Sequence, residues 1–271
     1  MATYYINADT GDDTTGDGSQ GNPWLTINHA VDQIADEEEA TIFAQNATAV
    51  YTFSGLNFKN RVDKIQGEST SGVVFDANNV DNVYWYNMNT IEQCTFINAR
   101  MIGNYKGMFQ GSFTISNCIF HDIYSNSNRS GIAQGSGTHT FISCIFYNYT
   151  NVAGLGGFFG RNDGQIVYTN LYNCVFYLNQ QVTSLWGNAN GDNTNALKNT
   201  IIYNDTAYDC VLSMDTTTMD YCCYYAASTG EFSNIPSGTG NINQDPMLVD
   251  PANFNFNLSP SSPCIDAGTL I

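Results

Sequence analysis

One short pattern recurs along the chain and constrains its fold more than any other feature. A cysteine has an apolar residue three places before it and a phenylalanine two places after it in the segments 91–96, 115–120, 141–146 and 171–176. Degenerate copies follow around Thr200 and Cys222, so successive central positions lie 24, 26, 30, 26 and 22 residues apart. Repeats of this length predict a solenoid, in which each copy forms one coil.

The spacing within a copy predicts a strand. The central position and the second residue after it share one side of a strand, because side chains alternate. A helix would need a longer apolar stripe, and the polar residues and glycines between copies leave no room for one. We therefore expect one short strand per coil, followed by turns. Two inward columns should result. One contains the free thiols of Cys94, Cys118, Cys144 and Cys174, and the other contains the rings of Phe96, Phe120, Phe146 and Phe176.

The fourth place after each central position is rich in asparagine. Asn and Asp tolerate the left-handed α conformation, so they suit a sharp corner after a strand. Corners in every coil would stack into a structural ladder of Asn98, Asp122, Asn148 and Asn204, with Leu178 in the fourth copy and Asn179 one place late.

Two further segments lie at the ends of the chain. Near the start, Tyr5 to Ala8 leads into Asp-Thr-Gly-Asp-Asp at 9–13 and Pro-Trp at 23–24. Near the end, Asp-Pro at 245–246 leads into Ser-Ser-Pro-Cys-Ile-Asp-Ala-Gly at 261–268. Together with the Cys-x-Phe repeat, these segments resemble the right-handed parallel β-helix proteins of the pectate-lyase-like superfamily, including phage virion and tailspike proteins.

The repeat and the resemblance imply one all-β domain over residues 1–271, a right-handed parallel β-helix with a short N-terminal capping helix. We expect a strand, a loop and the capping helix over 1–39, with Thr26 as the helix N-cap. The coils should run over 40–227, and a C-terminal closing segment over 228–271. No linker is visible between these parts.

The charge limits the partners. The chain has 8 basic and 25 acidic residues, a formal charge of −17, which repels nucleic acid and anionic membranes. No apolar run approaches the roughly 18 residues of a membrane span, and the start lacks the features of a Sec signal peptide. We therefore expect no nucleic acid partner and no membrane insertion, and a location on a virion or outside the cell.

Neither the acidic loop nor the cysteines predict a cofactor. Asp9, Asp12, Asp13 and Asp17 could supply oxygens to calcium, but they lack the EF-hand pattern, so we expect a solvated turn. The cysteine spacings match no zinc motif, and no metal site is expected. We assign no structural or functional role to Cys210 and Cys264 from the sequence.

Catalysis is the alternative to a structural role. Lyases of the superfamily use calcium carboxylates with an Arg or Lys. The basic residues of the central coils match no such motif: Arg100, Lys106, Arg129, Arg161 and Lys198. Hydrolysis would need only two carboxyl groups about 5 to 9.5 Å apart. Weak candidates are Asp122 beside His121, Asp163 and Asp192.

Aromatic residues suggest a binding surface. Tyr147, Tyr177 and Tyr203 share the third place after the central position, where His121 stands one coil earlier. We expect an outward stripe there, with Trp186 as a further ring, able to stack on sugars or to fill a protein interface. A ladder without a binding role is the alternative.

These observations favour a rigid, non-catalytic rod. We expect a structural or adhesive phage virion component, such as a capsid decoration or tail protein, that contacts another virion protein or a surface glycan, and a homotrimer is one possible assembly. The alternative is a polysaccharide depolymerase, a hydrolase or lyase or a tailspike, that acts through a carboxylate pair.

Overall fold

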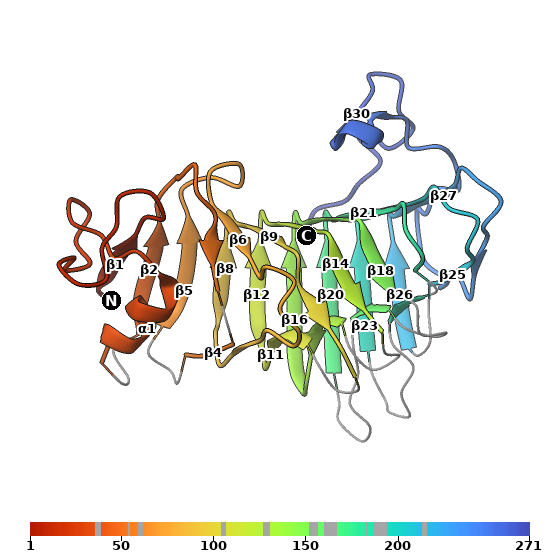
Figure 1. Ribbon diagram of the computed structural model, residues 1–271. Coiled ribbons are helices and arrows are strands. Elements are labelled where there is room, and N and C mark those ends of the chain that lie inside the picture. The colour runs from red at the N-terminus through yellow and green to blue at the C-terminus, as the bar shows by residue number, and fades with distance from the viewer. Residues whose placement is uncertain are drawn as a thin grey trace.

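A computed structural model shows that the chain winds into an elongated solenoid (Figure 1). It describes residues 1–35, 39–53, 55–58, 62–103, 107–126, 131–151, 157–159, 167–182, 184–186, 194–212 and 216–271. Strands of successive coils pair in parallel, and parallel crossovers of this kind are right-handed. The predicted fold class, a single-domain all-β parallel β-helix, is confirmed.

Three parallel sheets form the walls of the solenoid. The first wall contains β1 (Thr3–Ile6), β2 (Ala40–Ala44), β5 (Val62–Gly67), β8 (Thr90–Glu92), β12 (Phe113–Ser116), β16 (Gly137–Ile142), β20 (Val167–Tyr172), β23 (Thr194–Lys198) and β26 (Thr216–Asp220). The second contains β3 (Tyr51–Thr52), β6 (Val74–Asp76), β9 (Thr95–Ile97), β13 (Ile119–His121), β17 (Ile145–Tyr147), β21 (Val175–Leu178), β24 (Ile201–Asn204) and β27 (Cys223–Ala226).

The third wall contains β4 (Leu56–Asn57), β7 (Trp85–Tyr86), β11 (Gly107–Gln110), β15 (Gly131–Gln134), β19 (Gly157–Phe159), β22 (Ser184–Trp186), β25 (Cys210–Val211) and β28 (Phe232–Ser233). A short sheet of β10 (Arg100–Met101), β14 (Ile123–Ser125) and β18 (Tyr149–Asn151) follows the second wall. The expectation of one strand per coil was therefore wrong. The segments between the repeats also pair from coil to coil, although they lack the Cys-x-Phe pattern.

The repeat itself spans a corner between two walls. Ile91 lies in β8, Phe96 lies in β9, and Cys94 lies in the turn between them. The residue before the cysteine takes the left-handed conformation in each of these copies: Gln93, Asn117, Ser143 and Asn173 have φ of 57°, 51°, 53° and 54°. The sharp turn at this place is a feature that the sequence analysis missed.

The cysteines form a buried column of free thiols. The Cys94 backbone N–H donates to Cys118 Sγ at 3.5 Å, and the Cys94 thiol donates to the Glu92 carbonyl at 3.2 Å. Thr200 Oγ1 accepts from the Cys174 N–H at 3.4 Å, and Asn241 Oδ1 accepts from the Cys222 N–H at 3.0 Å. Asn241 is thus the central residue of one more copy, which the sequence does not reveal because Gly238 and Asn243 stand where the pattern has an apolar residue and a phenylalanine.

The phenylalanines stack inside the second wall. Ring centroids lie 5.3 Å apart for Phe96 and Phe120, 5.1 Å for Phe120 and Phe146, and 4.6 Å for Phe146 and Phe176. The planes differ by 9° or less in each pair, and all four residues are buried. Offset stacking contributes roughly 0.5–1.5 kcal/mol per pair beyond the burial of apolar area. The stack therefore holds neighbouring coils in register.

The corner after the second wall follows the prediction in part. Asn98, Asp122 and Asn148 are left-handed, with φ of 57°, 55° and 48°. Leu178 and Asn204 instead lie inside β21 and β24, so the expectation of a corner at these places was wrong. In these two coils the strand extends one residue further than in β13 and β17, and the corner follows it.

The two ends of the solenoid differ. At the N-terminal end α1 (Ile27–Gln33) buries Ile27, Ala30 and Val31, and Thr26 Oγ1 accepts from the His29 N–H at 3.1 Å, as expected of its N-cap. No described helix is long and apolar enough to cross a membrane.

The C-terminal residues do more than close the far end. β28 and the bridge from Ile242 to Cys223 add a partial coil. The chain then folds back over the second wall as β29 (Leu248–Asp250), the 3-10 turn Pro251–Asn253 and β30 (Asn255–Leu258), seen in blue in Figure 1. We call residues 245–271 the C-terminal arm.

One buried column of the first wall is polar. Phe113, His139, Thr169 and Asn195 occupy paired positions on neighbouring coils. The His139 ring stacks on Phe113 at 4.8 Å and is 0% exposed, and neither ring nitrogen makes a hydrogen bond of normal geometry to a described residue. Burial lowers the pKa of His139 to about 4, with a small opposing effect of the Gly111 backbone.

Replacement of Phe120 by Ala should reduce the free energy of unfolding by about 3–5 kcal/mol, because it opens a cavity in the middle of the stack. Urea denaturation measures this loss. Tyr168→Ala is the control, since Tyr168 is 45% exposed on the first wall and its removal should change stability by about 0.5 kcal/mol or less. Equal losses in the two variants would contradict the stack.

His139 should make the fold sensitive to acid. The unfolded chain binds a proton near pH 6.5 and the folded chain only near pH 4, so stability falls as the pH drops through this window. His139→Phe keeps the ring and removes the titration. The unfolding free energy of His139→Phe minus that of the unaltered protein should rise by about 3 kcal/mol as the pH is lowered from 7.5 to 4. A constant difference across that range would rule out the buried neutral imidazole.

Candidate functional site

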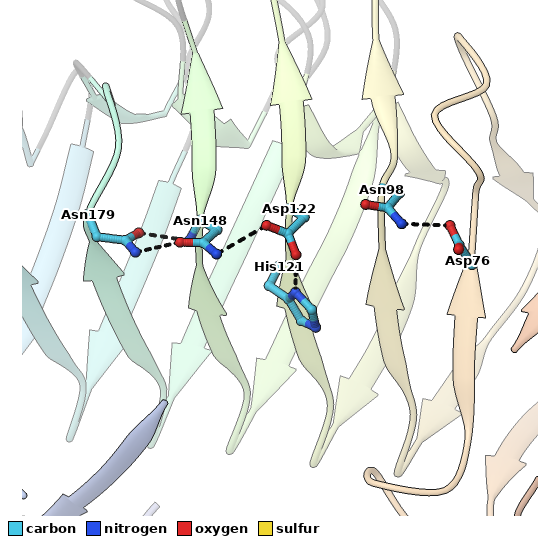
Figure 2. Close-up of polar contacts among 6 residues, drawn as sticks. All are labelled: Asp76, Asn98, His121, Asp122, Asn148 and Asn179. Atoms are coloured by element: carbon cyan, nitrogen blue, oxygen red, sulfur yellow. Dashed lines mark hydrogen bonds and ion pairs between the residues drawn. The ribbon is translucent and has the colours of Figure 1, made fainter. Parts of the chain in front are cut away.

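A row of polar side chains crosses neighbouring coils where the second-wall strands end. Asp76, Asn98, Asp122, Asn148 and Asn179 form this row, which we call the corner ladder (Figure 2). Asn98 Nδ2 donates to Asp76 Oδ1 at 2.9 Å, and Asn148 Nδ2 donates to Asp122 Oδ1 at 3.1 Å. The side chains of Asn148 and Asn179 also hydrogen-bond to each other. These contacts join Asp76 to Asn98, and Asp122 to Asn148 and Asn179, so the ladder consists of two hydrogen-bonded segments.

His121 and Asp122 form an acid–base pair within the ladder. His121 Nδ1 lies 2.6 Å from Asp122 Oδ2, and the His121 ring stacks on Tyr147 with centroids 4.6 Å apart. The side chain of Asp122 is 47% exposed, so it can reach a ligand from solvent. A carboxylate that orients an imidazole is an arrangement that can move a proton.

A shallow depression lies beside the ladder. Its volume is about 230 Å³, and it is lined by Asp122, Ile123, Tyr124, Asn148, Thr150 and Gln180. The Arg100 guanidinium lies 5.5 Å from the centre of the Tyr124 ring and pairs with Asp81 at 3.1 Å. The depression therefore offers one carboxylate, amides, hydroxyls and a ring, with the nearby cation already paired.

None of the other carboxylates is shown within pairing distance of Asp122 among the described residues. Asp163 and Asp192 lie outside the described residues. Asp76, in the same ladder, is two coils away, about 10 Å along the axis at a strand spacing of about 4.8 Å. That separation lies just above the roughly 6.5–9.5 Å range for a pair of carboxyl groups that activates water.

The tyrosine stripe points outward but is largely covered. Tyr147 stacks on Phe254 at 4.5 Å, and Tyr177 lies 5.6 Å from Phe256. Tyr147 and Tyr177 are only 6% and 4% exposed, and burial raises the pKa of Tyr147 to about 12. The expectation that these two rings are free for a ligand was wrong, because the C-terminal arm packs on them.

The other two rings named from the sequence also differ from expectation. Tyr203 continues the column, 5.7 Å from Tyr177, and is partly buried. Trp186 lies in β22 and is 1% exposed, so its expected outward position was wrong. Apolar residues at every second place, Phe254 just before β30 and Phe256 and Leu258 within it, were the sequence signal for an apolar face on the arm.

The carboxylates of the acidic loop accept hydrogen bonds from backbone N–H groups of neighbouring segments. Asp9 accepts from the Thr48 and Ala49 N–H groups at 2.6 and 2.8 Å, and Asp13 accepts from the Leu25 N–H at 2.8 Å. Backbone hydrogen bonds of this kind lower the pKa of Asp9 and Asp12, and hydrogen bonds from the side chain and backbone of Ser19 lower the pKa of Asp17. In the part of the chain that the structure describes, no three His, Cys, Asp or Glu side chains converge to hold a metal ion.

The fold and the site define a parallel β-helix protein with a polar outer ladder. No family model matches the chain, and no curated protein is similar to it in sequence. Among solved structures, a rhamnogalacturonan lyase has 12% identity and a TM-score of 0.43 over 83% of this chain and 74% of its own. The GH136 lacto-N-biosidase from Eubacterium ramulus has 9% identity and a TM-score of 0.42 over 90% and 67%. Identities this low carry no information about substrate.

Removal of the arm's rings should uncover the tyrosine stripe. In a Phe254→Ala/Phe256→Ala variant, nitration of Tyr147 and Tyr177 should increase at least tenfold, because both rings lose their cover. Mass spectrometry of tryptic peptides measures this, with Tyr168 as the internal reference for an exposed ring. Val249→Ala, which changes a 52% exposed residue of the same arm, is the control. Unchanged nitration in the double variant would contradict the packing.

Proposed function

We propose that the protein binds a neutral polysaccharide in the depression beside the corner ladder. The observation that carries this proposal is the fixed row of amides and carboxylates next to Tyr124 and Thr150. Sugar hydroxyls both donate and accept hydrogen bonds, which matches amide and carboxylate groups better than it matches an apolar protein surface. A partly exposed aromatic ring can also pack against the apolar side of a sugar.

The ladder is organised before any ligand arrives. Asn148 is hydrogen-bonded to Asp122 on one neighbouring coil and to Asn179 on the other. Side chains that are already ordered lose little conformational entropy on binding. Repetition of similar groups from coil to coil suits a polymer, because one chain can contact several coils at once.

The charge of the molecule favours an uncharged ligand. A formal charge of −17 repels polyanions, and Arg100 is paired with Asp81 and so offers little to an acidic sugar. Neutral glycans are therefore favoured over acidic ones. The virion setting expected from the sequence has no support in the fold or in the comparisons and stays a prediction.

Tyr124→Ala should weaken binding of a neutral polysaccharide at least tenfold, because it removes a ring from the depression. Affinity electrophoresis against a panel of neutral and acidic bacterial polysaccharides, followed by calorimetry on those that bind, measures this change. Tyr168→Ala is the matched control, since it removes an exposed tyrosine of the first wall, outside the depression. Equal affinity of the two variants, or binding of acidic glycans alone, would contradict the proposal.

Hydrolysis of the bound glycan is a second candidate, favoured by the 2.6 Å contact between His121 and Asp122 in the same ladder. Asp122 and Asp76 would be the two carboxyl groups. This candidate predicts new reducing ends in glycans that bind, and a loss of at least 100-fold in Asp122→Asn and in Asp76→Asn. Asp63→Asn is the control, because Asp63 bonds to Asn89 away from the ladder. A bound glycan that stays intact would leave binding as the whole function.

A further inference from the structure

The C-terminal arm is held on the second wall at several places. Phe254 and Phe256 pack on the tyrosine stripe. Farther along the arm, Asn199 Nδ2 donates to the Thr269 carbonyl at 2.7 Å, and the Thr269 N–H donates to Asn199 Oδ1 at 2.9 Å. These contacts are non-covalent, and each is individually weak.

Two cysteines meet where the arm crosses the last full coil. Cys223 comes from β27 and Cys264 from the arm, and both line a cavity of about 120 Å³ with Tyr221, Ile242 and Leu258. The Cys223 thiol donates to the Gln244 carbonyl at 3.2 Å, and the Cys264 side chain is the largest influence that raises the pKa of Cys223. The two cysteines thus face one small cavity, although their residues lie far apart in the chain.

This pair differs from the stacked cysteines of the core. Cys94, Cys118 and Cys144 are 0% exposed, and burial raises the pKa of the Cys118 thiol well above its usual value. Cys264 is partly exposed, and the hydrogen bond from Cys223 lowers the pKa of its thiol to about 7. A thiolate that solvent can reach is the reactive form of cysteine, whereas buried thiols are inert.

We propose that Cys223 and Cys264 are a disulfide-forming pair that fastens the C-terminal arm to the solenoid over the tyrosine stripe. This goes beyond the proposed glycan binding and does not depend on it. The oxidant is a low-molecular-weight disulfide, RSSR. The Cys264 thiolate attacks one sulfur of RSSR, so that a Cys264–S–S–R bond forms and one RS⁻ leaves.

The second step closes the bridge. Cys223 loses its proton to solvent, and its thiolate attacks the Cys264 sulfur and releases the second RS⁻. The two protein thiols are oxidised by two electrons in total, and RSSR is reduced to two RSH. The new bond closes a loop that contains most of the arm, so the arm can no longer lift as a unit from Tyr147 and Tyr177.

The test is oxidation of the folded protein by oxidised glutathione at pH 8. The intact mass should fall by two hydrogen atoms, and peptide mapping should find Cys223 linked to Cys264. Hydrogen exchange over residues 245–258 should slow at least tenfold relative to the reduced protein. A stable glutathione adduct on Cys264, or a link between another pair, would overturn the proposal. Identical hydrogen exchange in the oxidised and reduced proteins would overturn the claim that the disulfide fastens the arm.

Three serine variants complete the test. Cys264→Ser should neither lose the two hydrogens nor gain glutathione at Cys223, which is 3% exposed. Cys223→Ser should stop at a glutathione adduct on Cys264. Cys210→Ser is the control, because Cys210 is 0% exposed and should leave the link unchanged. A link that still forms in Cys264→Ser would contradict the assignment, whether or not the protein binds glycans.

Discussion

The register between neighbouring coils is the constraint on which the rest of the structure depends. Phe96, Phe120, Phe146 and Phe176 stack ring on ring, and the cysteine column beside them bonds from coil to coil. Because side chains alternate along a strand, a shift of one residue would move every inward side chain of that strand to the outer face. The corner ladder exists only because this buried stack places Asp122 beside Asn148 on the outside.

The fold class could be predicted because the buried columns repeat in sequence. A position that faces the axis meets the same neighbours in each coil, so residues such as Cys118 and Cys144 recur at a fixed phase. The third wall could not be predicted in the same way. Its inward column of Trp85, Phe109, Ala133, Phe159 and Trp186 is mostly aromatic, but neither its residue type nor its spacing is constant and no cysteine marks its phase.

The candidate site shows the same division. Asp122 and the tyrosine column could be found from their phase relative to the repeat. The cover over Tyr147 and Tyr177 could not, because it depends on a contact with residues 254–256 that lie far along the chain. The pairing of Cys223 with Cys264 was hidden for the same reason: contacts of the arm are set by its three-dimensional path and not by any period.

A double-mutant cycle on the phenylalanine stack tests the central claim most directly. The free energy of unfolding is measured for Phe120→Leu, Phe146→Leu and the double variant, and again for Phe120→Leu with Phe176→Leu. Neighbouring coils should give a coupling of about 0.5–1.5 kcal/mol, and the pair two coils apart should be additive within about 0.3–0.5 kcal/mol. Additivity in both pairs, or equal coupling in both, would contradict a register set by stacking between adjacent coils.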